Sequence, residues 1–293
     1  MKQLFLVDAS IYIFRAYFSL PDSLTDASGN PANAVYGFAG FLTRFLERSN
    51  ARHVGVAFDE SLTTSFRNEF YPEYKANREL PPPELETQLK ACQELTQALG
   101  LASYVSTRYE ADDLIGTLAH RMRKHEFSIV IVSGDKDLAQ LIADGDTWWD
   151  FTRDRRLGTE GIKDLFGVHP HQIVDYLALT GDKVDNIPGV AGIGPKTAAQ
   201  LLNRFDSLDS IYARLEEIPS MKLRGAVKVR ASLKDSEEQA YLSQRLARIA
   251  LDAPVAGVQD SLRRRSPNRE QLTAFCKKLG FGEGMRRKLG LSS

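Results

Sequence analysis

The sequence lacks the features that mark secreted, zinc-binding and membrane proteins. It has two cysteines in 293 residues, Cys92 and Cys276, and neither stands in a CxxC or Cys/His pattern. We therefore expect neither a disulfide framework nor a zinc site. The apolar stretch near the start is too short for a signal peptide and far too short to span a membrane. We expect a protein that resides in the cytoplasm and does not bind a membrane.

The sequence also lacks an excess of charge of either sign, because 38 Lys and Arg residues balance 38 Asp and Glu residues. The balance hides local basic runs: from residue 261 to the end, nine basic residues stand against two acids, and residues 221–230 hold four basic residues and no acid. Such runs indicate either the solvated face of a helix or a surface that binds a polyanion, and the sequence leaves both open. Acids reserved for metal ions would conceal a basic surface in the total charge.

The first half of the chain alternates strand-like and helix-like segments, which is typical of a mostly parallel sheet with helices on its faces. Five segments have the composition of strands: residues 3–9, 53–59, 102–106, 128–135 and 147–151. Helices are expected at residues 33–49, 84–100 and 112–125. We therefore predict the α/β class, with a central sheet of five or more strands.

After about residue 161 the pattern changes to short helices joined by polar connections. Two short helical pieces are expected around residues 168–170, and a further helix at 195–205 has Pro195 in its first turn, where the missing N–H costs nothing. We predict an α/β domain over residues 1–165 and a helical region over residues 166–293. The two parts could share one core.

One connection breaks the alternation of strands and helices. Residues 60–83 have no clean period, mix basic with aromatic side chains, and end in three prolines. Structureless loops of this length inside a compact domain are uncommon and usually functional, although a surface excursion without function is the alternative. Because the loop follows the strand that ends at Asp59, we expect it to project over the sheet edge where Asp59 lies.

Nine carboxylates stand at the ends or edges of these segments: Asp8, Asp59, Glu110, Asp112, Asp113, Asp135, Asp137, Asp182 and Asp185. In a parallel sheet the carboxyl ends of the strands form the edge at which ligands bind. Acids gathered there could not all stay ionised in a low-dielectric site unless cations held them. Since hard oxygen ligands without His or Cys suit Mg²⁺ or Mn²⁺, we predict a metal-dependent enzyme. For Asp112 and Asp113, and for Asp113 in particular, helix N-capping is the alternative.

A second motif, IPGVAGIGPKTA at residues 187–198, places three glycines in a short turn directly before a helix. Such a turn directs backbone N–H groups and the charge of Lys196 at an anion. A P-loop is excluded because Pro195 separates Gly194 from Lys196 and because no apolar strand precedes the turn. We predict a helix-hairpin-helix over residues 173–204 that grips a nucleic-acid backbone without reading bases, and a purely structural helix hairpin is the alternative.

Six motifs occur in order along the chain: LFLVDAS, VAFD, YKANR, EADD, SGDKDL and GDKVDNIPGVAGIGPKTA. Together they resemble the bacterial and phage 5′-nuclease family, the flap endonucleases, which also form the amino-terminal domain of bacterial DNA polymerase I. The resemblance runs to about residue 250 and the motifs stand in the order of that family. It implies a PIN-like nuclease core with a helical arch at about residues 60–84. It also implies a helix-three-turn-helix that binds duplex DNA, often around a K⁺ ion.

The resemblance implies a role for each candidate residue. Asp8, Asp59 and Asp112 match the ligands of one metal ion, Asp135, Asp137 and Asp185 match those of a second, and Glu110, Asp113 and Asp182 would be shared or water-mediated ligands. Lys75 matches the basic residue that approaches the scissile phosphate, Arg78 a second phosphate contact, Tyr74 a side chain that could stack on a base near the cut, and Arg67 a further DNA contact. Gly189, Gly192, Gly194, Lys196 and Thr197 match the turn and helix start that hold the duplex.

The resemblance therefore implies a Mg²⁺- or Mn²⁺-dependent 5′-3′ exonuclease or flap endonuclease that hydrolyses DNA by a two-metal mechanism. Its substrates would be 5′ ends, 5′ flaps and single-strand/duplex junctions, in primer or flap removal during replication and repair. We expect a standalone monomer, with a DNA polymerase as a candidate partner. A non-catalytic protein that binds DNA junctions is one alternative. A metal-dependent phosphatase for small molecules is the other, since an acid-lined α/β crevice suits that chemistry too.

Overall fold

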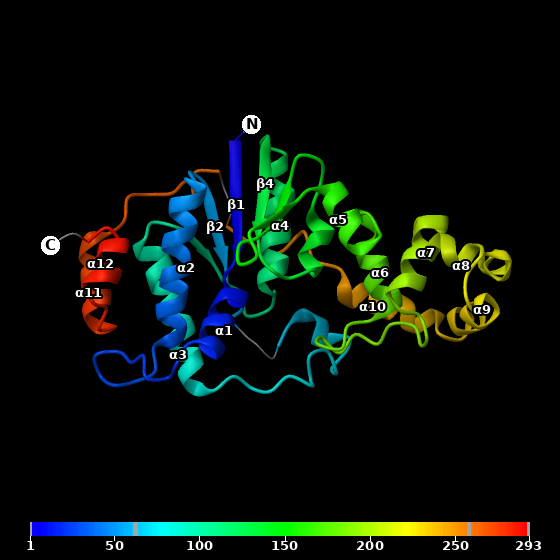
Figure 1. Ribbon diagram of the computed structural model, residues 1–293, viewed down its shortest axis with the longest axis horizontal. Helices are drawn as coiled ribbons and strands as arrows, with labels where there is room; N and C mark the ends of the chain where they lie inside the picture. The colour runs from blue at the N-terminus through cyan, green and yellow to red at the C-terminus, as the bar shows by residue number, and fades with distance from the viewer. Residues whose placement is uncertain (1, 61–63, 257–258, 292–293) are drawn as a thin grey trace.

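A six-stranded sheet forms the centre of the computed structural model, which describes residues 2–60, 64–256 and 259–291. The strands are β1 (Lys2–Asp8), β2 (Val54–Ala57), β3 (Ala102–Tyr104), β4 (Phe127–Val132), β5 (Thr147–Asp150) and β6 (Arg155–Leu157). Their spatial order is β3-β2-β1-β4-β5-β6, and every neighbouring pair is parallel except β5 with β6. Val7 of β1 lies opposite Val56 of β2 and Val132 of β4, so the carboxyl ends of the central strands meet at one edge (Figure 1). The predicted α/β class with a mostly parallel sheet is confirmed.

Alternate residues of the strands face two different cores, as the two-residue period of a strand requires. Phe5 and Val7 belong to one buried cluster, and Leu4 and Leu6 belong to the other. The helices of the first cluster are α1 (Ala9–Ser19), α2 (Asn33–Ser49), α3 (Pro83–Ala98), α11 (Arg269–Lys278) and α12 (Glu283–Lys288), and α4 (Ala111–Arg123) lies in the second. The helix predicted at residues 33–49 has the bounds of α2. Among the described residues, no helix is long and apolar enough to cross a membrane.

The second half of the chain forms a group of short helices beside the sheet (Figure 1). They are α5 (Thr159–Phe166), α6 (Ile173–Thr180), α7 (Pro195–Phe205), α8 (Leu208–Ala213), α9 (Ala226–Asp235) and α10 (Glu237–Ala247), with the 3₁₀ turns η3 (Pro170–Gln172) and η4 (Leu215–Ser220). A further 3₁₀ turn, η2 (Asp137–Leu141), lies earlier in the chain, between β4 and β5. Leu179, Leu202 and Leu246 are buried in the same cluster as Leu4 and Leu6. The helices and this face of the sheet therefore share one core, and α6 and α7 form the predicted helix hairpin.

After α10 the chain returns to the sheet and ends on its other side. The N–H of Val54 donates to the carbonyl of Leu262 at 2.8 Å, and the N–H of Arg265 donates to the carbonyl of Gly100 at 2.9 Å. Gly100 has a φ of +75°, and a Cβ there would lie 2.4 Å from the Arg265 carbonyl oxygen, so only glycine fits. α11 then packs on α3. The region predicted at residues 166–293 therefore lies in two places, with α11 and α12 at the end of the molecule away from α7–α9 (Figure 1).

The loop between β2 and α3 differs from the helical arch that the resemblance implies. Its described part contains one 3₁₀ turn, η1 (Phe66–Glu69), followed by further turns, and no α-helix occurs in residues 64–82. The lack of a 3.6-residue apolar period and the run of prolines at residues 81–83 explain why an α-helix does not form.

Candidate active site

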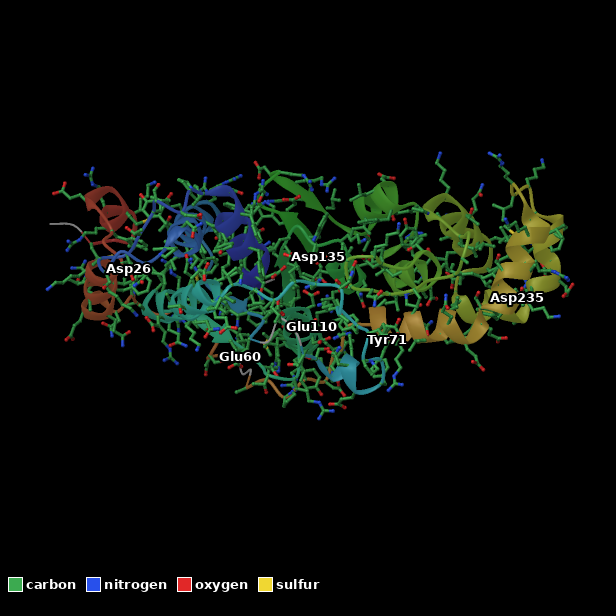
Figure 2. All side chains as sticks on the ribbon, turned by 90° about the horizontal axis from the view of Figure 1, so that it is seen from below. Asp26, Glu60, Tyr71, Glu110, Asp135 and Asp235 are labelled. Carbon is green, nitrogen blue, oxygen red and sulfur yellow. The ribbon has the colours of Figure 1, made fainter. Side chains whose placement is uncertain are left out.

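Acids from four separate segments gather at the carboxyl edge of the sheet. Asp8 is the last residue of β1, Asp59 follows β2, Asp112 lies in the first turn of α4, and Asp135 follows β4. Burial raises the pKa of Asp8 to about 7, and the charges of Asp59 and Asp135 act in the same direction. The pKa of Asp112 lies well above its ordinary value, through burial first and then through the charges of the other three acids. The four carboxylates therefore form one electrostatic site, and Figure 2 shows Asp135 near the middle of this face.

A second group of acids adjoins the first. Burial and then the charge of Asp135 raise the pKa of Asp137 well above its ordinary value. The Oδ1 atom of Asp137 is buried and has no hydrogen-bond partner among the described residues. Asp182 and Asp185 stand on the turn that follows α6, which is closed by a hydrogen bond from the N–H of Asp182 to the carbonyl of Ile187 at 2.9 Å. Both acids lie near enough to raise the pKa of Asp137 further.

Basic side chains of the protein itself pair with some of these acids. Lys75 forms an ion pair with Glu110, and its Nζ lies 3.6 Å from Oδ2 of Asp185. Arg78 forms an ion pair with Asp185. Burial alone would raise the pKa of Asp185, but the charges of Lys75 and Arg78 outweigh it and hold that pKa below its ordinary value. The loop that follows Asp59 therefore brings positive charge into the site.

The segment that carries Lys75 and Arg78 is fastened to the turn that carries Asp185. The N–H of Lys75 donates to the carbonyl of Asp185 at 3.1 Å, and the side-chain amide of Asn77 donates to the carbonyl of Lys183 at 2.8 Å. Lys75 has a φ of +56°, in the left-handed region that costs a non-glycine residue about 1 to 2 kcal/mol. These contacts connect the loop with the helix hairpin over the acids.

Arg67 and Asp113 form an ion pair in the interior. Arg67 is 3% exposed and Asp113 is fully buried. The Nη1 and Nη2 atoms of Arg67 donate to the two oxygens of Asp113 at 2.8 and 2.9 Å, and these oxygens also accept the N–H groups of Glu110 and Ala250. The predicted DNA contact of Arg67 does not fit this placement because its side chain is buried, and the predicted metal binding of Asp113 does not fit because both of its oxygens already accept hydrogen bonds. The N-capping alternative for Asp113 does fit, since it forms a capping box with Glu110.

Tyr74 is likewise enclosed at the base of the loop, with 4% of its surface exposed. Its hydroxyl lies 3.0 Å from Oε2 of Glu110 and 3.2 Å from Oδ2 of Asp185. The Nζ of Lys75 lies 5.0 Å from the centre of the ring, and the guanidinium carbon of Arg67 lies 5.8 Å from it. A base cannot stack on a ring enclosed in this way, so the predicted stacking role of Tyr74 does not fit the structure.

The turn before α7 exposes most of the predicted DNA contacts and buries one. Gly189 has a φ of +65°, and a Cβ there would lie 2.3 Å from the nitrogen of Gly181. The N–H of Gly189 donates to Oγ of Ser243 at 3.0 Å, so this buried glycine does not fit the predicted contact with DNA. Gly192 and Gly194 have open space where a side chain would be, Lys196 is exposed, and Thr197 is half-buried. Because Gly194 has no side chain to cap α7, the first N–H groups of that helix suit an anion.

Three polar residues beside the acids were not predicted from the sequence: Ser10, Ser133 and Lys136. The hydroxyl of Ser10 accepts the N–H of Asp59 at 3.1 Å, and Lys136 forms an ion pair of 2.7 Å with Asp182. Ser133 contacts Asp8. Each of the three stands within two residues of a predicted acid, and this proximity in sequence is the signal that could have identified them.

The donor atoms at this edge fit a divalent cation such as Mg²⁺ or Mn²⁺, because they are carboxylate oxygens, and burial followed by mutual repulsion raises the pKa of Asp8 and Asp112. The buried Oδ1 of Asp137, which has no hydrogen-bond partner among the described residues, also supports a cation site. With the side chains as they stand, no three acids among the described residues converge on one ion position. Lys75 and Arg78 lie among them instead. A bound ion would therefore compete with these two cations for the carboxylates.

Two family models match the chain, and each corresponds to one part of it. The model described as the 5′-3′ exonuclease N-terminal resolvase-like domain matches residues 3–167, and the model described as the 5′-3′ exonuclease C-terminal SAM fold matches residues 168–270. DNA polymerase I of Bacillus subtilis (strain 168) is 41% identical over 291 residues, which are 98% of this chain and 32% of that protein. The 5′-3′ exonuclease of Buchnera aphidicola subsp. Schizaphis graminum (strain Sg) is 36% identical over 255 residues, 87% of this chain and 88% of that protein. The chain thus spans about a third of the length of the polymerase relatives.

A solved structure with a similar fold is that of T5 5′-exonuclease with bound divalent metal ions (zinc). Its TM-score is 0.70 at 23% identity, and the match covers 95% of this chain and 100% of that one. At this identity the likeness concerns the fold, which agrees with the parallel sheet and the helical region described above.

Proposed function

Because the chain belongs to the 5′-3′ exonuclease family, we propose that it is a structure-selective 5′ nuclease that hydrolyses DNA phosphodiesters with the help of divalent metal ions. One observation carries the proposal: Asp8, Asp59, Asp112 and Asp135 lie in one electrostatic site at the edge of the sheet, where Asp8 is buried and the other three are half-buried. Like charges that are withdrawn from water destabilise the folded protein unless cations bind them. Metal ions bound to these acids would remove that repulsion, so the cluster indicates a metal site.

We assign Asp8, Asp59 and Asp112 to one Mg²⁺ or Mn²⁺ ion, Asp135, Asp137 and Asp185 to a second, and Glu110 and Asp182 to shared or water-mediated positions. When bound, the two ions lower the pKa of a water molecule and balance the charge that develops on the phosphate. The part of the protein is to hold the donor oxygens. Each acid follows a strand, starts a helix or stands on a closed turn, so the backbone beneath it is fixed by the fold.

Lys75 and Arg78 are the side chains that we assign to the substrate phosphates. In the structure they pair with Glu110 and Asp185. With Glu110 and Asp185 holding metal ions, both cations would be available to the phosphates of the strand that is cut. Lys75 would then stabilise the negative charge that increases in the transition state, and Arg78 would hold a neighbouring phosphate through paired N–H donors.

We assign the turn before α7 to the duplex next to the cut. Gly192, Gly194, Lys196 and Thr197 lie at the uncapped start of this helix, where N–H groups and a positive charge suit a phosphate. A K⁺ ion between this turn and the phosphate is part of the proposal. Phosphate contacts carry no sequence information, so the protein would select DNA by structure. Its affinity for duplex DNA should fall steeply as the salt concentration rises.

The biological setting that we assign to this activity is primer or flap removal in replication and repair, in the cytoplasm, by a monomer that acts beside a DNA polymerase. The similarity to a third of DNA polymerase I supports the link with polymerisation. The similarity to most of a separate 5′-3′ exonuclease supports an activity that does not need a polymerase in the same chain.

The deciding experiment is cleavage of a 5′-labelled flap duplex in Mg²⁺ and in EDTA, beside the flap strand alone. We expect metal-dependent cutting close to the junction, which the double variant Asp135→Ala/Asp137→Ala loses. Asp235→Ala is the matched control, because Asp235 is an exposed carboxylate at the far end of the helical region (Figure 2). Tight binding without cutting would support the junction-binding alternative. Metal-dependent hydrolysis of a small phosphate ester that DNA does not inhibit would support the phosphatase.

A further inference from the structure

The hydroxyl of Ser133 connects two acids that come from neighbouring strands. Ser133 is fully buried directly after β4. Its Oγ lies 2.8 Å from Oδ2 of Asp8 and accepts the N–H of Asp135 at 3.0 Å. Oδ1 of Asp135 in turn accepts the N–H of Asp137 at 2.9 Å. One side-chain oxygen thus joins the carboxylate at the end of β1 to the turn that carries Asp135 and Asp137.

When Asp8 is ionised, as it would be in binding a metal ion, the direction of these hydrogen bonds is fixed by the groups themselves. The N–H of Asp135 can only donate, so the Ser133 oxygen accepts from it and the single hydroxyl hydrogen is left for Asp8. The register of the sheet brings the partners together, because Val7 and Val132, which precede Asp8 and Ser133, lie opposite each other. Asp8 and Asp135 are repelled by each other's charge, and the hydroxyl is a neutral link between them.

We propose that Ser133 is a positioning residue that holds Asp8 and the turn bearing Asp135 in register for divalent-metal binding. The proposal rests on the proposed function, since the two acids are assigned to different metal ions. Without the hydroxyl, Oδ2 of Asp8 and the N–H of Asp135 would lose a partner inside a buried site where repulsion drives the acids apart. Polar groups that orient metal ligands typically contribute about 10- to 100-fold in metal affinity.

The simpler explanation is that Ser133 has only a structural role. Two other serines show how the contacts of such a residue differ from those of Ser133. Ser243 also accepts a backbone N–H, that of Gly189, but its own hydrogen goes to the carbonyl of Gln239. Ser49, the last residue of α2, has a buried Oγ with no hydrogen-bond partner among the described residues. A serine that only fills space or closes a turn has no reason to donate to a carboxylate of the site. Ser49 therefore offers a matched control for the loss of a buried hydroxyl.

The test is Mn²⁺ binding by titration calorimetry, without DNA, for the wild type and for Ser133→Ala, Ser133→Thr, Ser133→Val and Ser49→Ala. The Thr and Val variants have the same shape and differ only in the hydroxyl, so any cost of the added volume is common to both. We expect Ser133→Ala and Ser133→Val to bind Mn²⁺ about 10-fold more weakly or worse. Ser133→Thr and Ser49→Ala should bind as the wild type does. The Mg²⁺ concentration for half-maximal flap cleavage should shift in parallel.

Equal Mn²⁺ affinity in the wild type, Ser133→Ala and Ser133→Val would overturn the positioning role while the nuclease proposal stands. Melting curves in EDTA separate folding from binding. If Ser133→Thr and Ser133→Val were equally unfolded or equally weak in binding, the position would serve packing and the proposal would fail. A wild type that binds no Mn²⁺ and cuts no flap DNA would instead overturn the proposed function itself, and the role of Ser133 with it.

Discussion

Arg67 holds both carboxylate oxygens of Asp113, at 2.8 and 2.9 Å, although 46 positions separate the two residues in the chain. The same guanidinium donates to the carbonyl of Leu246 at the end of α10. One buried cation therefore joins the loop after β2, the start of α4 and the last turn of the helical region. Arg67 therefore holds the base of the loop in place, which indicates that it stabilises the fold and does not bind DNA.

Arg67→Ala is expected to destabilise the protein by about 3 to 5 kcal/mol, because it leaves the carboxylate of Asp113 buried without its partner. Urea unfolding followed by circular dichroism measures this loss. The double variant Arg67→Ala/Asp113→Ala should recover part of the stability, since no unpaired charge then remains. Wild-type stability together with weakened DNA binding in Arg67→Ala would show that Arg67 contacts DNA after all.

Lys75→Ala is expected to lower the turnover of flap DNA by about 100-fold or more, which is the usual cost of one lost group that stabilises transition-state charge. Affinity for the uncut duplex should stay within about two-fold, because the contact is made at the cut phosphate. Single-turnover cleavage and binding in Ca²⁺ measure the two quantities. Lys124→Ala is the control, since Lys124 is an exposed lysine at the other end of α4. An equal loss of affinity and turnover would make Lys75 a binding residue.

The stability of the metal-free protein should depend on pH through Asp8. Burial first, and then Asp59, raise the pKa of Asp8 from 3.8 to about 7 in the folded state. The folded state therefore holds this proton more tightly than the unfolded state does. The contribution of this proton to the free energy of unfolding is fully present below pH 3.8 and is lost as the pH rises through about 7.

In EDTA, the melting temperature of the wild type should therefore fall relative to that of Asp8→Asn between about pH 4 and about pH 7, by about 2 to 4 °C for each kcal/mol lost. Scanning calorimetry across this range checks the difference, and Mg²⁺ should reduce it by binding the ionised form. Parallel pH profiles of the two proteins would mean that Asp8 does not gain its proton on folding.

Gly189→Ala and Gly192→Ala should differ sharply, although both glycines lie in one turn with positive φ. A Cβ at Gly189 meets the backbone of Gly181 at 2.3 Å, whereas a Cβ at Gly192 meets nothing within 4 Å. We expect Gly192→Ala to cost about 1 to 2 kcal/mol through its backbone conformation alone. Gly189→Ala should cost more and should also weaken duplex binding. Thermal unfolding measures the stability of the two variants, and fluorescence anisotropy with a flap duplex measures their affinity for DNA. Equal stability and equal affinity would show that the turn at Gly189 has room to adjust.

Much of the fold could be predicted because its signals are local. α2 begins and ends where its apolar period does, and α7 begins at Pro195, as predicted for residues 195–205. The acids at strand ends could be found for the same reason, since an apolar run that closes at Asp8 needs no tertiary information to be noticed. β6 was missed because residues 155–157 are short, basic and at the edge of the sheet, so they have no apolar pattern.

What the sequence did not show depends on contacts between distant segments. Tyr74 stands in a basic loop, a sequence context that suggests an exposed aromatic side chain. It is an interior residue only because Glu110 and Asp185 lie around it in the folded protein. The pairing of Arg67 with Asp113 and the return of residues 262–265 to β2 and α3 are likewise set by tertiary packing. No local period or motif marks such contacts in advance.

The return of the chain after α10 has a mechanical consequence for where DNA would be cut. The helical region leaves the sheet through α5 and comes back by the backbone hydrogen bonds of Leu262, Arg264 and Arg265, so it is anchored at both ends. The turn before α7 is therefore held at a set spacing from Asp8 and Asp135. If that turn binds the duplex, this fixed distance sets the position of the cut. The scissile bond would then lie a constant number of nucleotides from the gripped phosphate, whatever the length of the flap.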